Sequence, residues 1–179
     1  MEALEAFEAV RDYFVKTGSQ HHVNLCDLDV AEIHLHLLRP TEAVPFAKRA
    51  VDGFATTAMK YEHAKALAFL GMGLAQIDQL AEAEAAAVEA REMFEVEGNK
   101  YWIGVVDFCL SYMRMAKGDV AKARLLAAQA NLQFKNMETK DTMTESLTRL
   151  GSMAFETSQV KTAASCMAEV LKLTINKRR

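Results

Sequence analysis

The chain repeats itself every 40 residues, and this internal repeat constrains the fold more than any other feature. When the 179 residues are cut after positions 20, 60, 100 and 140, the segments align without gaps. Alanine recurs in one column of the alignment and phenylalanine in another. These columns are Ala43, Ala83, Ala123 and Ala163, and Phe54, Phe94 and Phe134. A period of this length predicts stacked copies of one supersecondary unit, each covering the apolar face of the next.

The spacing inside each repeat predicts a pair of helices. Ala43, Ala47, Ala50 and Phe54 follow one another at steps of four, three and four residues, so they form one stripe on a helix. Small residues in that stripe allow a neighbouring helix to approach closely. The first half of each repeat provides that neighbour. Each repeat is therefore expected to be an antiparallel pair, helix A followed by helix B.

Residues typical of helix ends lie between the predicted helices. We expect Thr41 and Asp119 to act as N-caps, because their side-chain oxygens can accept hydrogen bonds from first-turn amides. Gly98 is expected to end a helix by adopting a left-handed conformation. These signals place a turn in the middle of each repeat and another between repeats.

The repeats account for the whole chain as one domain over residues 1–179. It comprises a half repeat at 1–20 and full repeats at 21–60, 61–100, 101–140 and 141–179. This organisation predicts about nine helices. Because the chain starts at the second half of a repeat, we expect a piece of a longer protein, the alternative being a solenoid that starts with a single helix.

Small and large residues at these positions resemble the tetratricopeptide repeat (TPR). The best match is the segment 61–100, which carries a Leu-Gly pair in helix A and alanines in helix B. The matching residues are Leu70, Gly71, Leu74, Ala83, Ala87 and Ala90. The period is 40 residues rather than the usual length of about 34, and the proline that often closes helix B is absent. HEAT and armadillo repeats have similar lengths, but the Leu-Gly and alanine columns favour the TPR type.

The resemblance implies an all-α fold: a right-handed superhelical solenoid of antiparallel helix pairs whose A helices line the concave face. Arrays of this longer repeat resemble those in bacterial multidomain regulators and in eukaryotic motor light chains. Such solenoids bind other proteins. If the frame holds, the residues expected to contact a peptide or partner are Lys65, Met72, Gln76, Phe108, Tyr112, Met115 and Phe155. The alternative left open for the apolar strip of Phe108, Tyr112 and Met115 is that these side chains belong to the core or are covered by a neighbouring segment.

Composition narrows the function classes. The net charge is −3, which does not favour direct binding to nucleic acid, and no run approaches the ~20 apolar residues of a membrane span. The N-terminus lacks the basic start and apolar run of a signal peptide. We therefore expect a cytoplasmic protein. The three cysteines, Cys26, Cys109 and Cys166, are far apart and are interpreted as reduced thiols within helices.

No pattern predicts an active site or a cofactor. His22 and Cys26 are one helical turn apart, but no second pair completes a zinc site. His34 and His36 point in different directions on a helix, so they do not suit one metal ion. Gly71-Met72-Gly73 lies in a predicted helix without the strand that precedes a phosphate-binding loop. The sequence therefore predicts neither metal nor cofactor, and a protein that is not an enzyme.

Three functions stay open at this point. The favoured one is a scaffold that binds a protein or peptide in the concave groove. The alternative is a regulatory or assembly segment that packs on other domains of a larger bacterial signalling or transcriptional regulator. The least favoured is an enzyme or ligand sensor on the same fold. The predicted final helix is apolar, which suggests homo-oligomerisation through uncapped solenoid ends. Its apolar residues are Val170, Leu171, Leu173 and Ile175.

Overall fold

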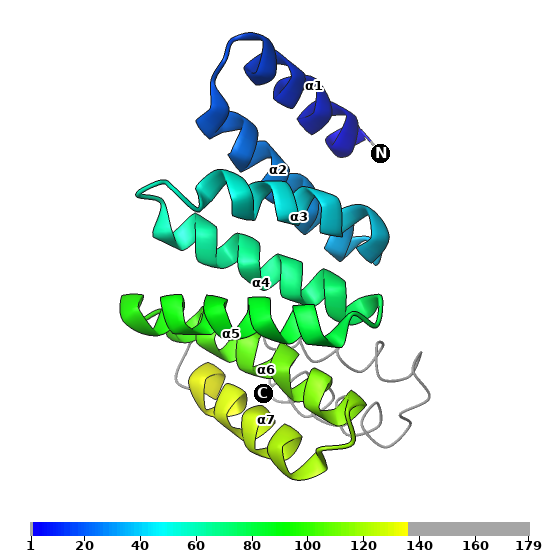
Figure 1. Cartoon of the computed structure of the whole chain (residues 1–179), viewed down its shortest axis with the longest axis vertical. Coiled ribbons are helices and arrows are strands. Elements are labelled where there is room, and N and C mark those ends of the chain that lie inside the picture. Colours follow the sequence, from blue (N-terminus) through cyan, green and yellow to red (C-terminus); the bar gives the residue numbers. More distant parts are fainter. Residues whose placement is uncertain (1, 136–179) are drawn as a thin grey trace, which may run out of the picture. The chain divides into compact units, whose positions relative to one another are not determined.

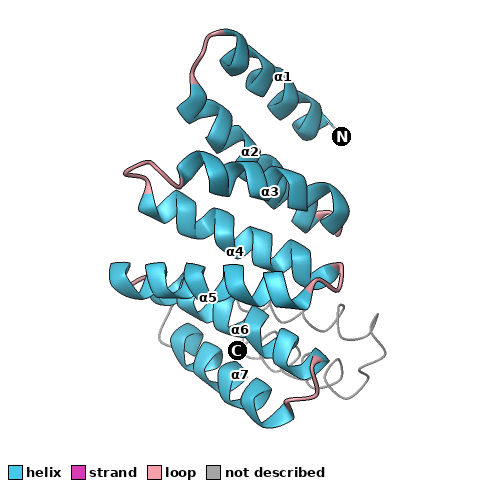
Figure 2. Ribbon diagram, in the orientation of Figure 1, coloured by secondary structure: helices cyan, strands magenta, loops and turns pink. Residues whose placement is uncertain are grey.

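The computed structural model describes residues 2–135, which form seven helices joined by short connections (Figures 1 and 2). Alanine, leucine, glutamate and lysine, all strong helix formers, dominate these segments. The helices are α1 (Glu2–Lys16), α2 (Gln20–His36), α3 (Pro40–Phe54), α4 (Lys60–Gln76), α5 (Leu80–Glu97), α6 (Lys100–Ala116) and α7 (Val120–Lys135).

The helix boundaries reproduce the predicted period. The A helices α2, α4 and α6 begin at residues 20, 60 and 100, and each has 17 residues. The B helices α3, α5 and α7 begin at residues 40, 80 and 120. Helix α1 occupies the B position of the half repeat. The predicted helix pairs over 21–135 are therefore confirmed.

The chain divides into two compact units, residues 1–99 and 100–179. Within the first, each of the helices α1 to α4 packs against the next one along the chain, and α2 also contacts α4 (Figure 1). Within the described part of the second, α6 packs against α7. The division falls at a repeat boundary, as the alignment leads one to expect. A single domain over 1–179 stays a prediction.

The turn inside each repeat has one conformation in all three described copies. Leu38, Asp78 and Gly118 occupy equivalent positions and have positive φ angles of 55°, 65° and 81°. The residue that follows each of them donates its amide hydrogen to a carbonyl five residues earlier, as in Arg39 N to His34 O at 2.9 Å. This pattern is the Schellman motif, which satisfies carbonyls at the end of a helix. Gly98, with φ 69°, ends α5 in the same way, as predicted.

The Leu-Gly column brings helices A and B into close contact. A Cβ added at Gly71 of α4 would lie 3.1 Å from the Ala83 carbonyl oxygen and 3.3 Å from the Ala87 Cβ, both on α5. Ser111 is the equivalent residue of α6, and its hydroxyl donates a hydrogen bond of 2.8 Å to the Ala123 carbonyl of α7. The residues that carry the TPR resemblance therefore form the interface within each of these pairs.

Two expectations about helix ends have different outcomes. Asp119 precedes α7, and its Oδ1 accepts a hydrogen bond of 3.1 Å from the Lys122 amide, so the predicted cap is confirmed. Thr41 is not an N-cap, because α3 begins one residue earlier, at Pro40. Proline favours the first helical turn because its φ is already helical and its missing amide has no partner there. Pro40 is therefore the first residue of α3, and Arg39 stands at the N-cap position.

About nine helices were predicted for the whole chain, and residues 2–135 contain seven. The two that would complete the number fall in the repeat 141–179, which lies outside the described residues.

Candidate functional site: the face of helices α2 and α4

One side of the neighbouring A helices α2 and α4 carries a mixed polar and apolar surface, here called the α2/α4 face. Its members recur at steps of four, three and four residues, so they share one side of each helix. Most of them are half-buried, and Phe69 is buried. The members are Leu25, Asp29, Glu32 and His36 on α2, and Lys65, Phe69, Met72 and Gln76 on α4.

Lys65 links the two helices across this face. Its Nζ donates a hydrogen bond of 2.8 Å to Glu32 Oε2 and lies 5.2 Å from the centre of the Phe69 ring. The Lys65 side chain is 19% exposed, so the pair is partly shielded from water. His36 Nε2 lies 3.8 Å from the other oxygen of Glu32, one turn along α2. The positive charge of Lys65 is therefore already paired with Glu32 within the protein.

Asp29 is a poorly hydrated carboxylate on the same face. Burial raises the pKa of Asp29 above its ordinary value, and Glu32 raises it further, while the Lys65 ammonium opposes both by lowering it. Together Asp29 and Glu32 carry two negative charges against the single positive charge of Lys65. A cation placed beside Asp29 would relieve the cost of its burial.

The structure distributes the predicted contact residues differently from the sequence-based expectation. Lys65, Met72 and Gln76 are half-buried and lie on the α2/α4 face. In α6, Phe108 and Tyr112 are only 6% and 5% exposed, so the expected open apolar strip is wrong for these two residues. Met115, also on α6, is half-buried. Phe155 lies outside the described residues.

The repeat explains why Phe108 is buried. It packs with Ala130 and Phe134 of α7 in a core cluster bordered by Tyr101 and Val105. Its equivalents are buried as well: Leu28 is 3% and Ala68 is 2% exposed. This column is therefore part of the core in every described repeat. Comparing how apolar it is across the repeats, rather than assigning it to a groove from the family frame, would have identified it from the sequence.

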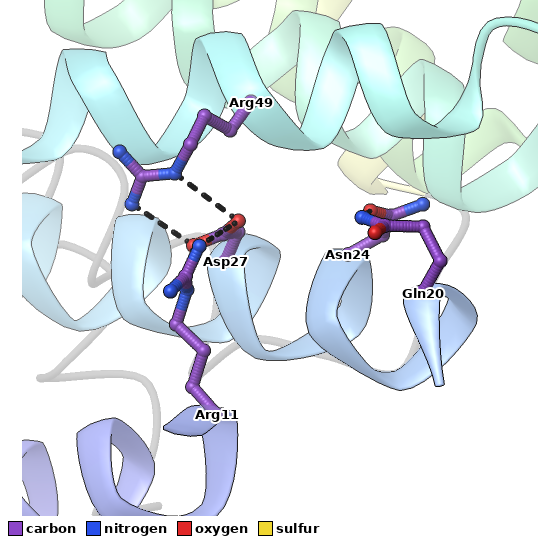
Figure 3. Close-up of polar contacts among 5 residues, drawn as sticks. All are labelled: Arg11, Gln20, Asn24, Asp27 and Arg49. Atoms are coloured by element: carbon purple, nitrogen blue, oxygen red, sulfur yellow. Dashed lines mark hydrogen bonds and ion pairs between the residues drawn. The ribbon is translucent and has the colours of Figure 1, made fainter. Parts of the chain in front are cut away.

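A buried ion-pair cluster was not predicted (Figure 3). Asp27 of α2 is 2% exposed and accepts hydrogen bonds from Arg11 of α1 and Arg49 of α3. Arg11 Nε lies 2.7 Å from Asp27 Oδ1, and Arg49 Nη2 lies 3.0 Å from the same oxygen. The Arg49 guanidinium also lies 4.3 Å from the centre of the Phe46 ring. The three helices α1, α2 and α3 are thus joined at one carboxylate.

The glycine and asparagine beside that cluster show how closely α2 and α3 approach. A Cβ added at Gly53 of α3 would overlap the Asn24 side chain of α2. Asn24 is buried, and its Oδ1 accepts a hydrogen bond of 2.9 Å from Gln20 Nε2 (Figure 3). Glycine at position 53 therefore provides the space that Asn24 fills.

The histidines and Cys26 that were considered as metal ligands have other surroundings. The His22 ring stacks on Phe14 at 4.4 Å between ring centres, and Cys26 is buried. Burial raises the pKa of the Cys26 thiol, and nearby carboxylates add to the effect. His34 is buried and stacks on Phe46 at 5.6 Å, whereas His36 is exposed. Within residues 2–135, no three histidine, cysteine or acidic side chains gather as a metal site would require.

None of the described helices combines the length and the apolar character that crossing a membrane requires.

The fold is similar to that of solved helical repeat proteins. BtubC (BKLC) from P. vanneervenii matches with a TM-score of 0.61 and 16% identity, over 97% of this chain and 80% of that chain. A crystal structure of a Podosopora anserina kinesin light chain protein with nearly identical TPR-like repeats matches with a TM-score of 0.67 and 19% identity, over 99% of this chain and 88% of that chain. No protein-family model and no curated protein matches the sequence.

These likenesses establish a TPR-like helical repeat fold. The TPR-like architecture predicted from the Leu-Gly and alanine columns is confirmed at this level.

Proposed function

We propose that the protein is a protein–protein interaction scaffold that binds a segment of a partner along the α2/α4 face. The observation that carries this proposal is the combination of half-buried apolar and charged side chains on two neighbouring A helices. Met72 offers a flexible, polarisable surface, which suits recognition of a helix or an extended peptide. The TPR-like fold supports the proposal as a scaffold but does not identify the partner.

The electrostatics of the face favour a partner segment that carries a basic residue. Lys65 already pairs with Glu32 at 2.8 Å, so binding a partner carboxylate there would require that pair to break. Asp29 has a pKa raised by burial, so it gains from an added cation. We therefore propose that Asp29 and Glu32 bind a lysine or arginine of the partner, and that Met72 packs against an apolar side chain beside that residue.

The finer architecture belongs to the same proposal. The proposed solenoid is right-handed with the A helices on its concave side, and Met72 and Gln76 are the residues proposed to line that side. The protein acts in the cytoplasm without catalysing a reaction, binds no cofactor and contacts neither nucleic acid nor a membrane directly. Copies of the protein can also associate with one another through the ends of the solenoid.

Selection from a random peptide library displayed on phage tests the proposed chemistry. The full chain should enrich peptides that place a lysine or arginine near an apolar residue. Binding of the enriched peptides should weaken at least about tenfold in the double variant Asp29→Asn/Glu32→Gln, because each lost charge contact is worth about 1 kcal/mol or more. The matched control is Glu42→Gln/Glu97→Gln, which removes two exposed charges from the B helices α3 and α5.

Unchanged binding to Glu42→Gln/Glu97→Gln would support the assignment. If no peptide is enriched, or if the enriched peptides bind Asp29→Asn/Glu32→Gln as tightly as the wild type, the α2/α4 face does not bind partners in this way.

A second function is favoured by one observation at the N-terminal helix. Val10 and Tyr13 of α1 are 46% and 61% exposed, which suits a segment that packs on another domain. In that reading the protein is a regulatory or assembly segment of a larger bacterial regulator. If no partner binds at the α2/α4 face and α1 contacts another domain, the regulatory or assembly function is favoured over the scaffold.

A further inference from the structure

Each B helix has an outer face that packing within the repeat array leaves exposed. In α3, which packs against both α2 and α4, this face consists of four residues on one stripe of the helix, and all four are exposed. They are Thr41, Pro45, Lys48 and Asp52. Because α3 has a helix packed on either side, neither neighbour of a B helix covers these positions. The equivalent residues of α5 and α7 are exposed as well.

The outer face of α7 is apolar along its length. Its residues are Ala121, Leu125, Ala128 and Leu132, and the two leucines are 59% and 61% exposed. The equivalent stripe of α3 has two charged residues and a threonine, as an ordinary solvated face does. A continuous exposed apolar strip on a folded helix is typical of an interaction surface.

The charge beside this strip has one sign and lies at one end. Lys122 and Arg124 are exposed in the first two turns of α7, and the helix contains no acidic residue. Asp119 precedes the helix, and its Oδ1 is already hydrogen-bonded to the Lys122 amide. A binding partner should therefore present an apolar strip with carboxylates at one end.

The outer face of α5 has this chemistry. Its first three residues, Ala81, Ala85 and Val88, are exposed and apolar, and Val88 is 40% exposed. Glu92 continues the same stripe and Glu89 lies beside it, both exposed. The residues of α5 are small where those of α7 are large, so the leucines of one strip can lie in the grooves between small residues of the other.

Both helices carry charges that their own dipoles disfavour. The last turn of α5 holds Glu95 and Glu97 and no basic residue, although the C-terminal end of a helix is partially negative. The first turn of α7 holds Lys122 and no acidic residue, although the N-terminal end is partially positive. An antiparallel arrangement of an α5 and an α7 would bring these two ends together and relieve both.

We propose that the outer face of α7 binds the outer face of α5 in a second copy of the chain, with the two helices antiparallel. In this register Leu132 lies opposite Ala81, Leu125 lies opposite Val88, and Lys122 lies beside Glu92. The contact differs from association through the ends of the solenoid. It is also separate from the α2/α4 face and does not depend on the function proposed for that face.

The proposed contact joins two different surfaces, so every copy carries one of each and the copies associate head to tail. Two variants that each lose one surface test this property. Leu125→Glu/Leu132→Glu removes the α7 strip and retains the α5 strip. Val88→Lys/Glu92→Lys does the reverse. All four positions are exposed, and circular dichroism checks that both variants remain helical.

Sedimentation equilibrium measures the association. The mass of the wild type should rise with concentration over about 10–100 µM, as a small interface leads one to expect. Each variant alone should remain a monomer. An equimolar mixture of the two variants should form a dimer, because each supplies the surface that the other lacks.

The matched control is Val10→Glu/Leu37→Glu, which places two glutamates at positions 46% and 50% exposed elsewhere on the molecule. It should associate as the wild type does. A monomeric wild type over this range, wild-type association of either variant alone, a monomeric mixture, or equal loss in the control would each overturn the proposal.

Charge reversal tests the antiparallel register. Glu89→Lys/Glu92→Lys should weaken the association at least about tenfold at low salt, because four positive charges then face one another. Adding Lys122→Glu/Arg124→Glu to the same chain should restore it. Association that is insensitive to the first pair of changes, or that is not restored by the second, would show that these helix ends do not meet and would overturn the proposal.

Discussion

At the scale of single residues, Asp27 is the charged group whose partners should contribute most to the free energy of unfolding. Its carboxylate is buried and receives two guanidinium groups, each through two hydrogen bonds. Either arginine alone still leaves the carboxylate with a charged partner. Loss of both leaves a buried charge without an ionic partner, which is far more costly than the loss of one of two.

A double-mutant cycle on Arg11 and Arg49 tests this arrangement. Methionine retains much of the packing of the arginine stem. We expect Arg11→Met and Arg49→Met each to lower the free energy of unfolding by about 1–2 kcal/mol. The double variant should lose about 3–5 kcal/mol, more than the sum of the single changes. Urea unfolding monitored by circular dichroism measures all four proteins. Additive losses would contradict a shared role at Asp27.

His63 of α4 makes stability depend on pH. Burial lowers the pKa of His63 below its ordinary value of 6.5; Glu89 opposes this effect by raising the pKa, and Lys60 adds to it. The unfolded chain therefore binds a proton at this site more readily than the folded chain. It follows that the contribution of His63 to stability is complete above the unfolded value and is lost as the pH falls through the folded pKa.

We expect His63→Gln to flatten the fall in stability between about pH 7.5 and about pH 5.5, because glutamine takes up no proton. Thermal unfolding across this range measures the effect. His21→Gln is the matched control, since His21 is exposed on α2. That variant should follow the wild-type curve. A wild-type slope in His63→Gln would show that His63 does not contribute.

Residue-level interpretation of the sequence was the least successful part of the prediction. Phe108 and Tyr112 were placed in an open groove, with the core as the alternative, and they are buried. The helical period places residues on a stripe, but it does not state whether a neighbour covers that stripe. The Asp27 cluster was missed for a related reason. Arg11, Asp27 and Arg49 belong to three different helices, and each resembles an ordinary solvated charge when read alone.

At the scale of the elements, the recurring turn inside the repeats carries backbone strain in two of three copies. Leu38 and Asp78 adopt positive φ angles where the third copy has Gly118. A left-handed conformation costs an L-residue with a Cβ roughly 1–2 kcal/mol, and glycine avoids most of that cost. The hydrogen bonds of the Schellman motif offset the strain in the native turn.

Leu38→Gly should therefore stabilise the protein by up to about 1 kcal/mol, after allowance for the greater freedom of glycine in the unfolded chain. The neighbouring substitution Leu37→Gly is the control. Leu37 has an ordinary φ of −82° and is 50% exposed, close to the 51% of Leu38. It should lose about 0.5–1 kcal/mol. Chemical denaturation separates the two, and equal losses would contradict the strain at Leu38.

Element boundaries were the most predictable feature. The 40-residue period placed the helices correctly because packing repeats with the sequence, so each copy supports the assignment of the others. Asp119 and Gly98 began and ended helices as expected, since capping is a local interaction. Thr41 failed as a cap because Pro40, one residue earlier, is the stronger helix-starting signal.

At the scale of the whole molecule, a repeat fold presents the side of its A helices to partners. Here that side is the α2/α4 face, where Lys65 pairs with Glu32 and Asp29 is half-buried. The sequence predicted the TPR-like architecture, but the chemistry of this face required knowledge of which side chains already pair within the protein.

The most direct test of the central claim is site-specific photocrosslinking in the native host. A benzoylphenylalanine replaces Met72 on the α2/α4 face or, as the control, Ala85 on the exposed side of α5. The account predicts a discrete protein adduct from position 72, absent from position 85 and reduced when Asp29→Asn/Glu32→Gln is combined with the probe. No adduct from position 72, or equal adducts from both positions, would contradict a scaffold that binds its partner along α2 and α4.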